Sequence, residues 1–244
     1  MPSKEDLKRQ AFQAIDDRAD EIVGLAQTIL KNPEPGFRET KTSKLVANKF
    51  AELGIPFKAG MAMTGVRGEI TGGTAGPTLA ILGELDSLIV SEHPHADPET
   101  NAAHACGHNA QIAGLMGSAL GLVEAGVAQE LAGTVVFFAV PAEEYVEIEY
   151  RLGLTKEGQT TFLAGKPELV QLGAFDDIDM AVMIHSGSMD SLEGSAGVSA
   201  SSNGFLAKTI CFRGKAAHAG VAPEQGVNAL NAATLALHAI HAQR

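Results

Sequence analysis

Two short and almost wholly apolar runs, Thr134–Val140 and Met180–Ile184, most constrain what this chain can fold into. Runs of this length without alternation are typical of strands that are covered on both faces, as in a parallel sheet. Turn residues separate two further expected strands, Val66–Ile70 and Thr78–Leu85. Because helical segments alternate with these strands, we predict a layered α/β domain.

The helical segments are recognised by the spacing of their apolar residues and by their ends. Ser3 can cap the first helix together with Asp6, three residues further on. Gly54 is placed to end the second helix. The third is rich in Ala, Leu and Gly, which indicates burial on several sides. The expected helices are Lys4–Leu30, Thr40–Leu53, Gly107–Val127 and Asn228–Ala242.

The character of the sequence changes after about Ser195. Residues Ser199–Gly204 are small and mostly polar, as in a hinge, and Leu206–Arg213 alternates like a half-exposed strand. We therefore predict two domains, over residues 1–197 and 198–244.

Composition mainly excludes classes of partner. The net charge of −11 argues against nucleic acid and anionic membranes, which both require a basic surface. No apolar stretch approaches the roughly 18 residues of a membrane span, and the polar first residues do not form a secretory signal. Two cysteines, Cys106 and Cys211, are no disulfide framework. We expect a protein of the cytoplasm.

Residues that could carry chemistry follow the predicted strands. Glu84 and Asp86 lie at the end of one strand, Glu143 and Glu144 follow another, and His185 ends a third. In open α/β sheets, sites form at the carboxyl ends of strands. Four segments meeting at that edge, with the Cys-Gly-His sequence at 106–108 as the fourth, are more informative than any one of them.

Cys106 and His108 are potential zinc ligands, because thiolate and imidazole both suit that metal. On a regular helix the two side chains would point about 200° apart. They can share a metal only where the turn is not helical, which Gly107 permits. A buried cysteine beside a helix-capping histidine is the alternative, and the pattern alone favours that alternative.

Glu143 and Glu144 are adjacent carboxylates directly after a buried strand. Their mutual repulsion and desolvation are costly unless cations balance them. A metal could bind one and leave the other as a base, or the pair could lie in a solvated loop. Asp86 could be a ligand, could orient a histidine ligand or could cap a helix. A lone histidine is more often structural than functional, but the place of His185 at the end of a predicted strand favours a functional role.

His218 stands among small residues, where it could donate to a developing oxyanion or lie in a turn. His93 and His95 are interpreted as surface residues of a Pro-flanked loop. Cys211 is expected to pack. A cysteine hydrolase with Cys106 as nucleophile and a nearby histidine as base is a further alternative, but no oxyanion loop accompanies it and the acidic pair would be unexplained.

Five motifs, taken together in their order along the chain, resemble those of the M20 family of metallopeptidases and amidohydrolases. The branch most similar includes N-acyl-amino-acid and indole-acetyl-amino-acid hydrolases and aminobenzoyl-glutamate hydrolase. Asn109 replaces the Asp of many members and points to the aminobenzoyl-glutamate-like members. The motifs are GELDSL (83–88), HACGHNAQIAGLMGSA (104–119), PAEE (141–144), MIHS (183–186) and GKAAHAGVAPEQGVNALNAA (214–233).

This resemblance implies a three-layer α/β/α catalytic domain with a mixed, largely parallel sheet, incomplete within residues 1–197. Residues 198–244 would begin a smaller α/β lid domain through which the full-length protein forms a homodimer. The implied reaction is hydrolysis of the C–N amide bond of an N-acyl amino acid, an aminobenzoyl-glutamate-like compound or a small peptide. The alternative is an incomplete fragment that binds metal or ligand without turnover.

The resemblance also implies roles for single residues. Two divalent ions, zinc or manganese, would be bound by Cys106, His108, Glu144 and His185, with a fifth ligand expected beyond Arg244. Glu143 would be the general base, Asp86 would orient the site, and His218 would help to hold the scissile carbonyl.

Overall fold

A computed structural model describes residues 2–187, 196–198 and 203–243. The chain divides into two compact units, Met1–Ser191 and Leu192–Arg244. Part of the predicted hinge, Ser199–Ser202, lies outside the described residues.

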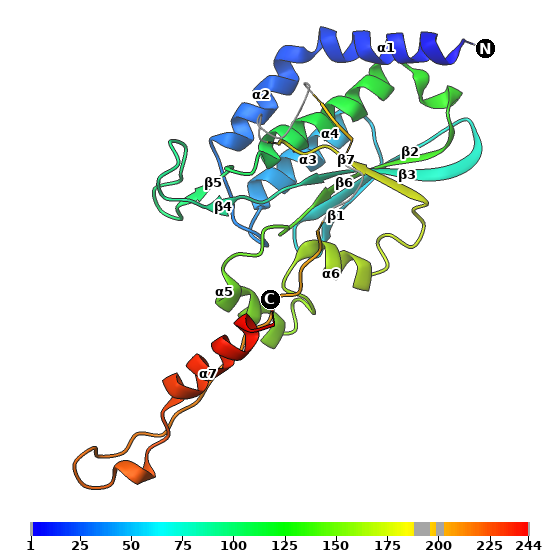
Figure 1. The fold of residues 1–244 in the computed structure, drawn as a ribbon. Coiled ribbons are helices and arrows are strands. Elements are labelled where there is room, and N and C mark those ends of the chain that lie inside the picture. The colour runs from blue at the N-terminus through cyan, green and yellow to red at the C-terminus, as the bar shows by residue number, and fades with distance from the viewer. Residues whose placement is uncertain (1, 188–195, 199–202, 244) are drawn as a thin grey trace. The chain divides into compact units, whose positions relative to one another are not determined.

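The first unit is built on a mixed five-stranded sheet with the order β1-β2-β6-β3-β7 (Figure 1). Strand β3 runs parallel to both β6 and β7, whereas β2 runs antiparallel to β1 and β6. A separate two-stranded ribbon pairs β4 with β5. The strands are β1 (Phe57–Met61), β2 (Gly65–Thr71), β3 (Thr74–Glu84), β4 (Leu88–Ile89), β5 (Ala102–Ala103), β6 (Ala132–Val140) and β7 (Met180–Met183).

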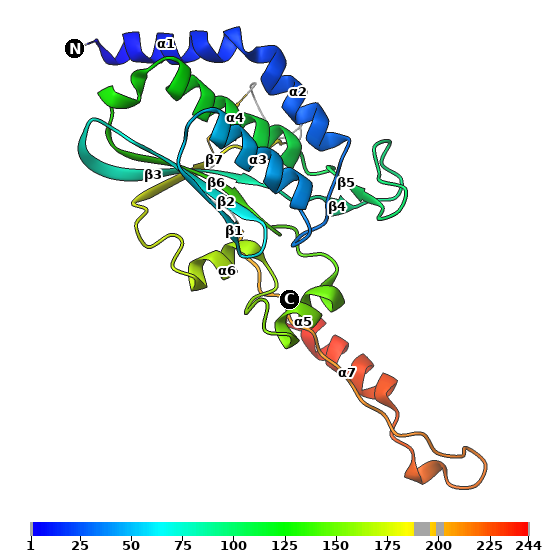
Figure 2. The same ribbon diagram turned by 180° about the vertical axis from the view of Figure 1, so that it is seen from behind.

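Helices cover both faces of this sheet, as Figures 1 and 2 show: α3 and α4 lie on one face and α6 on the other. In the second unit the described residues contain η3 (Pro223–Gln225) and α7 (Ala229–His241). None of the described helices has the length and apolar character needed to cross a membrane. The helices of the first unit are α1 (Lys4–Asp17), α2 (Ala19–Leu30), α3 (Thr40–Glu52), α4 (His108–Glu124), η1 (Val127–Glu130), α5 (Ile148–Lys156) and α6 (Gly165–Gln171).

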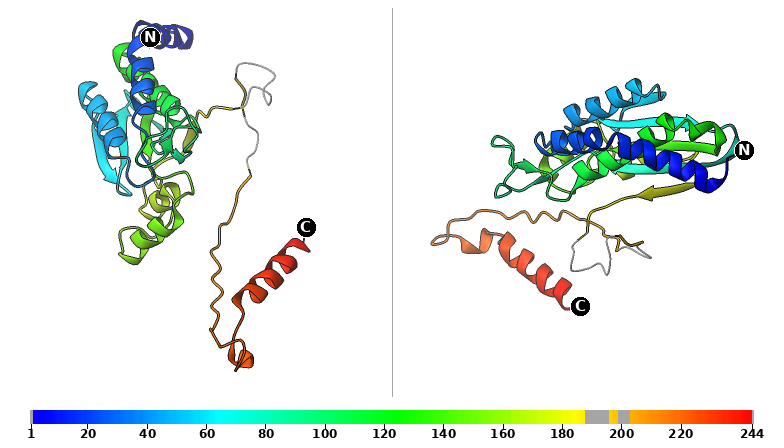
Figure 3. Two further views of the ribbon diagram at one scale, coloured as in Figure 1. Left: turned by 90° about the vertical axis from the view of Figure 1, so that its left-hand side faces the viewer. Right: turned by 90° about the horizontal axis from the view of Figure 1, so that it is seen from above.

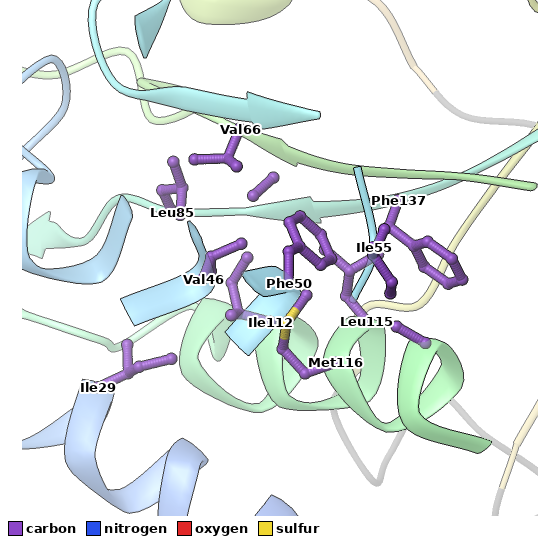
Figure 4. Close-up of a cluster of buried hydrophobic side chains, with 12 residues drawn as sticks. Ile29, Val46, Phe50, Ile55, Val66, Leu85, Ile112, Leu115, Met116 and Phe137 are labelled. Atoms are coloured by element: carbon purple, nitrogen blue, oxygen red, sulfur yellow. The ribbon is translucent and has the colours of Figure 1, made fainter. Parts of the chain in front are cut away.

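Alternate side chains of β6 enter two separate cores. Phe137 packs with Phe50 and Leu115 on the α3–α4 side, as Figure 4 shows. Val136 and Phe138 face the other way and pack with residues of α6 and the segment that follows it. A strand buried on both faces explains the continuous apolar run in the sequence. The three-layer α/β/α prediction is therefore confirmed, and Figure 3 gives the layers in two further views.

Several predicted elements differ from the structure. The first helix is divided at Arg18 into α1 and α2, although its capping box of Ser3 and Asp6 is present. Strand β1 and helices α5 and α6 were not predicted, because their apolar residues are too few to show a period. The predicted strand at 206–213 is wrong: these residues have no ladder partner among the described residues and are exposed. Alternation alone does not form a strand, because its backbone groups need a partner.

Replacing Phe50 with Ala should destabilise the first unit strongly. Its ring is fully buried and lies against Phe57 and Phe137, with centroids 6.2 and 6.3 Å away. We expect a loss of about 3–5 kcal/mol in the free energy of unfolding, measured with urea. Phe12→Ala is the matched control, since Phe12 is 62% exposed, and its loss should stay within about 0.5 kcal/mol. Equal losses would contradict this assignment of the core.

Candidate functional site

The ends of three parallel strands bring the predicted site residues to one edge of the sheet. Glu84 ends β3 and is paired in register with Val140, the last residue of β6. Two residues before Glu84 along β3, Leu82 is in register with Met183, the last residue of β7. The segments that follow the three strands therefore leave the sheet close together, as the sequence predicted.

Cys106, His108 and His185 meet in this region because the backbone turns sharply at Gly107. Gly107 has φ of 92° and precedes the first residue of α4. A Cβ there would lie 2.4 Å from Ser186 Oγ. Both the positive φ and this close contact favour glycine at position 107. Cys106 Sγ lies 3.3 Å from His185 Nε2. One ligand atom from each of the three side chains falls within 4.8 Å of the others, so they could hold a metal ion.

Asp86 connects His108 to the turn that carries the acidic pair. His108 Nδ1 donates to the Asp86 carbonyl oxygen at 2.8 Å and lies 3.4 Å from its Oδ1. The other carboxylate oxygen of Asp86 accepts from the Glu144 backbone N–H at 2.9 Å. Because Nδ1 is used by this carbonyl, Nε2 is the His108 atom left for a metal.

A second group shares His108 with the first. His108 Nε2 lies 3.0 Å from Glu84 Oε2 and 3.9 Å from Glu143 Oε2. Ligand atoms of Glu84, His108 and Glu143 also fall within 4.8 Å of one another. Lys166 forms an ion pair with Glu84 Oε1, and its Nζ is 3.7 Å from Glu143 Oε1. Neither Glu84 as a member of this group nor Lys166 was predicted.

The charges of the second group shift its pKa values in different directions. Burial opposes the charged imidazole, yet Asp86 and Glu84 outweigh it and raise the pKa of His108 to about 10. Burial alone would raise the pKa of Glu84, but His108 and Lys166 lower it to about 2. Burial and then the charge of Glu84 raise the pKa of Glu143 above its ordinary value.

The charges that act on Cys106 from the described residues are negative. Burial and then the hydrogen bond and negative charge of Glu144 raise the pKa of its thiol to about 12. In these surroundings the thiolate is unfavourable until a cation neutralises the carboxylates.

The turn before Glu143 is held by residues that sequence reasoning missed. Ala142 has φ of 47°, which is unusual for a residue with a side chain. Its N–H donates to Glu39 Oε1 at 2.7 Å, and Thr64 donates to the other oxygen of Glu39 at 2.6 Å. The Ala142 carbonyl oxygen accepts from the Gly165 N–H at 2.9 Å. The only sequence signal for Glu39 was its place before a helix, which is common to many exposed residues.

Several buried polar atoms at this edge lack a hydrogen-bond partner among the described residues. A divalent cation would supply a partner to such nitrogen and oxygen atoms, and the donor set of thiol, imidazole and carboxylate suits zinc. The residues therefore fit a metal. The atoms without a hydrogen bond are His108 Nε2, Glu144 Oε1, Glu84 Oε2 and Asp86 Oδ1. His108 Nε2 and Glu84 Oε2 lie 3.0 Å apart, but not in the geometry of a hydrogen bond.

The remaining histidines lie in different surroundings. His218 is in the second unit, is exposed, and its Nδ1 accepts from the Gly220 N–H at 3.2 Å. His104 is buried, and its two ring nitrogens are without partners in the described structure. Burial lowers its pKa to about 4, with the charge of His108 as the second cause. His93 and His95 have ring centroids 5.9 Å apart. Cys211 is exposed, so the packing role predicted for it is wrong.

Sequence comparison identifies the family to which this chain belongs. The profile of peptidase family M20/M25/M40 matches residues 80–241. The chain belongs to this family, as its motifs indicated.

Individual relatives add detail. The chain is 38% identical over 132 residues to IAA-amino acid hydrolase ILR1-like 5 of Arabidopsis thaliana, a match that covers 53% of this chain and 30% of that protein. It is 28% identical to thermostable carboxypeptidase 2 of Saccharolobus solfataricus, covering 91% of this chain and 53% of the relative. The chain thus spans about half the length of these curated relatives, or less.

Among solved structures, the Bacillus subtilis YXEP protein is described as a dinuclear metal binding peptidase from the M20 family. It is 26% identical with a TM-score of 0.54, and the match covers 66% of this chain and 41% of that one. The aminobenzoyl-glutamate utilization protein from Klebsiella pneumoniae is 20% identical with a TM-score of 0.54, covering 73% and 46%. The latter likeness shows the fold alone.

Replacing Glu39 with Gln should flatten part of the pH dependence of stability. Burial and then the charge of Asp86 raise the pKa of Glu39 from 4.5 to about 7. Between these values the folded chain holds a proton that the unfolded chain has released, so stability falls as pH rises through this window. The shift corresponds to a loss on the order of 3 kcal/mol. Gln cannot ionise; its oxygen can accept from the Ala142 N–H, and its amide N–H can donate to the Thr64 hydroxyl, which then acts as the acceptor.

The measurement is urea unfolding at pH 5 and pH 8 in the presence of a chelator. The stability of Glu39→Gln should exceed that of the wild type at pH 8 and approach it at pH 5. Glu52→Gln is the control, because Glu52 is exposed at the far end of α3, the helix that Glu39 precedes, and pairs only at the surface. A wild-type difference between the two pH values that persists unchanged in Glu39→Gln would show that Glu39 is ionised in the folded state.

Proposed function

We propose that this chain forms most of the active site of a metal-dependent hydrolase that cleaves the C–N amide bond of an N-acyl amino acid, an aminobenzoyl-glutamate-like compound or a small peptide. The observation that carries the proposal is the meeting of Cys106, His108 and His185 within 4.8 Å. The acidic pair follows the neighbouring strand, and Glu144 is tied to the same Asp86 as His108. Relatives named as amino acid hydrolases and carboxypeptidases support the substrate class.

Cys106, His108, Glu144 and His185 are the proposed ligands for two divalent ions, zinc or manganese. The thiolate of Cys106 favours zinc, since sulfur ligands suit that metal better than manganese. Bound divalent ions supply Lewis acid chemistry, which polarises a carbonyl and makes water more acidic.

Glu143 is the proposed general base. Its side chain is about one-third exposed, so a water molecule and a substrate can reach it. It would take the proton of the attacking water and return it to the leaving amine. The pKa of Glu143 is raised above its ordinary value. A carboxylate with a raised pKa is a stronger base toward the attacking water, and it can hold the proton until the amine leaves.

Asp86 and His218 have supporting roles in the proposal. Asp86 holds the His108 ring so that Nε2 faces the ligand group. The Nδ1 of His218 accepts a backbone hydrogen bond, so the neutral ring carries its proton on Nε2. That N–H is available to donate to the oxyanion that forms on the substrate. His218 would act from a lid domain that also forms a homodimer.

The geometry disfavours Cys106 as a nucleophile. A nucleophilic cysteine needs a lowered pKa, whereas burial and the carboxylate of Glu144 raise the pKa of this thiol to about 12. The same negative surroundings attract a cation. A thiolate ligand must stay reduced, and both cysteines of the chain are free. These two points support the proposal that the protein works in the cytoplasm.

Replacing Glu143 with Gln should remove turnover and leave metal binding intact. General-base catalysis contributes about 10²–10⁴-fold, so hydrolysis of N-acyl amino acids should fall by at least that range. Zinc content is measured by elemental analysis of the same sample. Glu149→Gln, on an exposed position of α5, is the control and should keep full activity.

Wild-type rates in Glu143→Gln would exclude the proposed base. Assays of the 244-residue chain and of a chain extended to the length of its relatives separate hydrolysis from the alternative, metal or ligand binding without turnover. Zinc binding without hydrolysis by the 244-residue chain, together with hydrolysis by the extended chain, would favour an incomplete fragment, whereas equal activity of the two chains would exclude it.

Replacing His185 with Ala should weaken zinc binding, because it removes one of three neighbouring ligand atoms. We expect a loss of at least about tenfold in affinity, measured by calorimetry against a competing chelator. His93→Ala is the matched control, since His93 lies in the loop between β4 and β5 and is in neither group of neighbouring ligand atoms. Equal affinities of the two variants would exclude His185 as a ligand.

A further inference from the structure

Lys166 brings a positive charge from the opposite layer of the domain to the end of β3. It is the second residue of α6, and that helix begins against the turn before Glu143. The Gly165 N–H donates to the Ala142 carbonyl, and a Cβ on Gly165 would lie only 1.7 Å from the Pro141 carbonyl oxygen. This close approach fixes the start of α6, and with it the origin of the Lys166 side chain.

The lysine ammonium enters a group that would otherwise attract a metal cation. Glu84, His108 and Glu143 offer ligand atoms within 4.8 Å of one another. Lys166 pairs with Glu84 Oε1 and lies 3.7 Å from Glu143 Oε1. Glu84 is 1% exposed, so its charge needs a partner within the protein.

His108 belongs to two groups, but its Nε2 can bind a metal in only one of them. When this nitrogen serves the group with Cys106 and His185, it no longer compensates the charge of Glu84. Lys166 is then the cation that remains beside that buried carboxylate among the described residues. The lysine also stays next to Glu143, the proposed base.

We propose that Lys166 is a positioning residue whose ammonium takes the place of a metal between Glu84 and Glu143. It thereby confines metal binding to the side of Cys106, His108 and His185, and it holds the Glu143 carboxylate in place for proton transfer. The second half of this inference rests on the proposed function, whereas the first half concerns metal binding alone.

Removal of the Lys166 charge should move two measurements in opposite directions. Without the ammonium, the group of Glu84 and Glu143 is more negative by one unit, so a divalent cation should bind more tightly. Glu143 loses the cation that holds it, so turnover should fall. General damage to the site would instead lower both metal affinity and turnover, and this difference in sign identifies a positioning role.

The experiment measures zinc affinity by calorimetry against a chelator, and hydrolysis of N-acyl amino acids, in matched variants. Lys166→Met should bind zinc at least about tenfold more tightly, as expected for one unit charge at close range in a protein, and should lose at least about tenfold in kcat. Lys166→Arg keeps the charge and should stay near the wild type in affinity. Lys156→Met, at an exposed position of α5, should change neither quantity.

A double variant, Lys166→Met with Glu84→Gln, restores the balance of charge and should return zinc affinity to about the wild-type value. It also replaces the ion pair by neutral groups of similar size, so it tests the inference if Lys166→Met alone fails to fold. Zinc binding in Lys166→Met that is unchanged or weaker overturns the inference. A double variant that stays as tight as the folded single variant also overturns it.

Failure of the proposed function gives a different pattern. If the wild type binds no zinc but Lys166→Met does, Lys166 excludes the cation as inferred, and the proposed metal site of the wild type is wrong. If neither binds zinc, both are overturned. If the wild type binds zinc without hydrolysis, the affinity changes alone decide the inference.

Discussion

The carboxylate of Asp86 is the contact on which the candidate site depends. It lies just beyond β3, is fully buried, and joins an imidazole from the start of α4 to the backbone after β6. Three elements distant in sequence are thereby held at one point. Because the carboxylate is shielded from water, its hydrogen bond from the Glu144 N–H is strengthened. For the same reason it is costly that Oδ1 makes no hydrogen bond among the described residues.

Much of the fold could be predicted because burial leaves a direct mark on sequence. The run that became β6 is apolar on both faces, and its side chains do enter two cores. Elements without such a mark were missed: α6 is short, and it is positioned by the contact of Gly165 with the turn at Ala142. The exposed alternating segment 206–213 misled in the other direction, since periodicity says nothing about a pairing partner.

The candidate site was predictable in part, for a related reason. Cys106 and His108 are recognisable by residue type and spacing, and His185 by residue type and its place after a predicted strand. Glu39 and Lys166 do not, because an acidic residue before a helix and a lysine within one are common on protein surfaces. Their significance comes from burial and from neighbours more than 80 residues away in the chain, as with Lys166 and Glu84. Only the tertiary structure supplies that information.

Because Glu84 pairs with Val140 and Leu82 with Met183, the meeting of the proposed metal ligands depends on the register of the sheet. A slip of one residue between β3 and either neighbour would displace the following loop by about 3.3 Å and turn its side chains to the other face. A chain paired in the wrong register could keep its helices and much of its apolar burial, yet its ligand atoms would no longer meet. Metal retention would therefore distinguish correctly folded molecules from compact, misaligned ones.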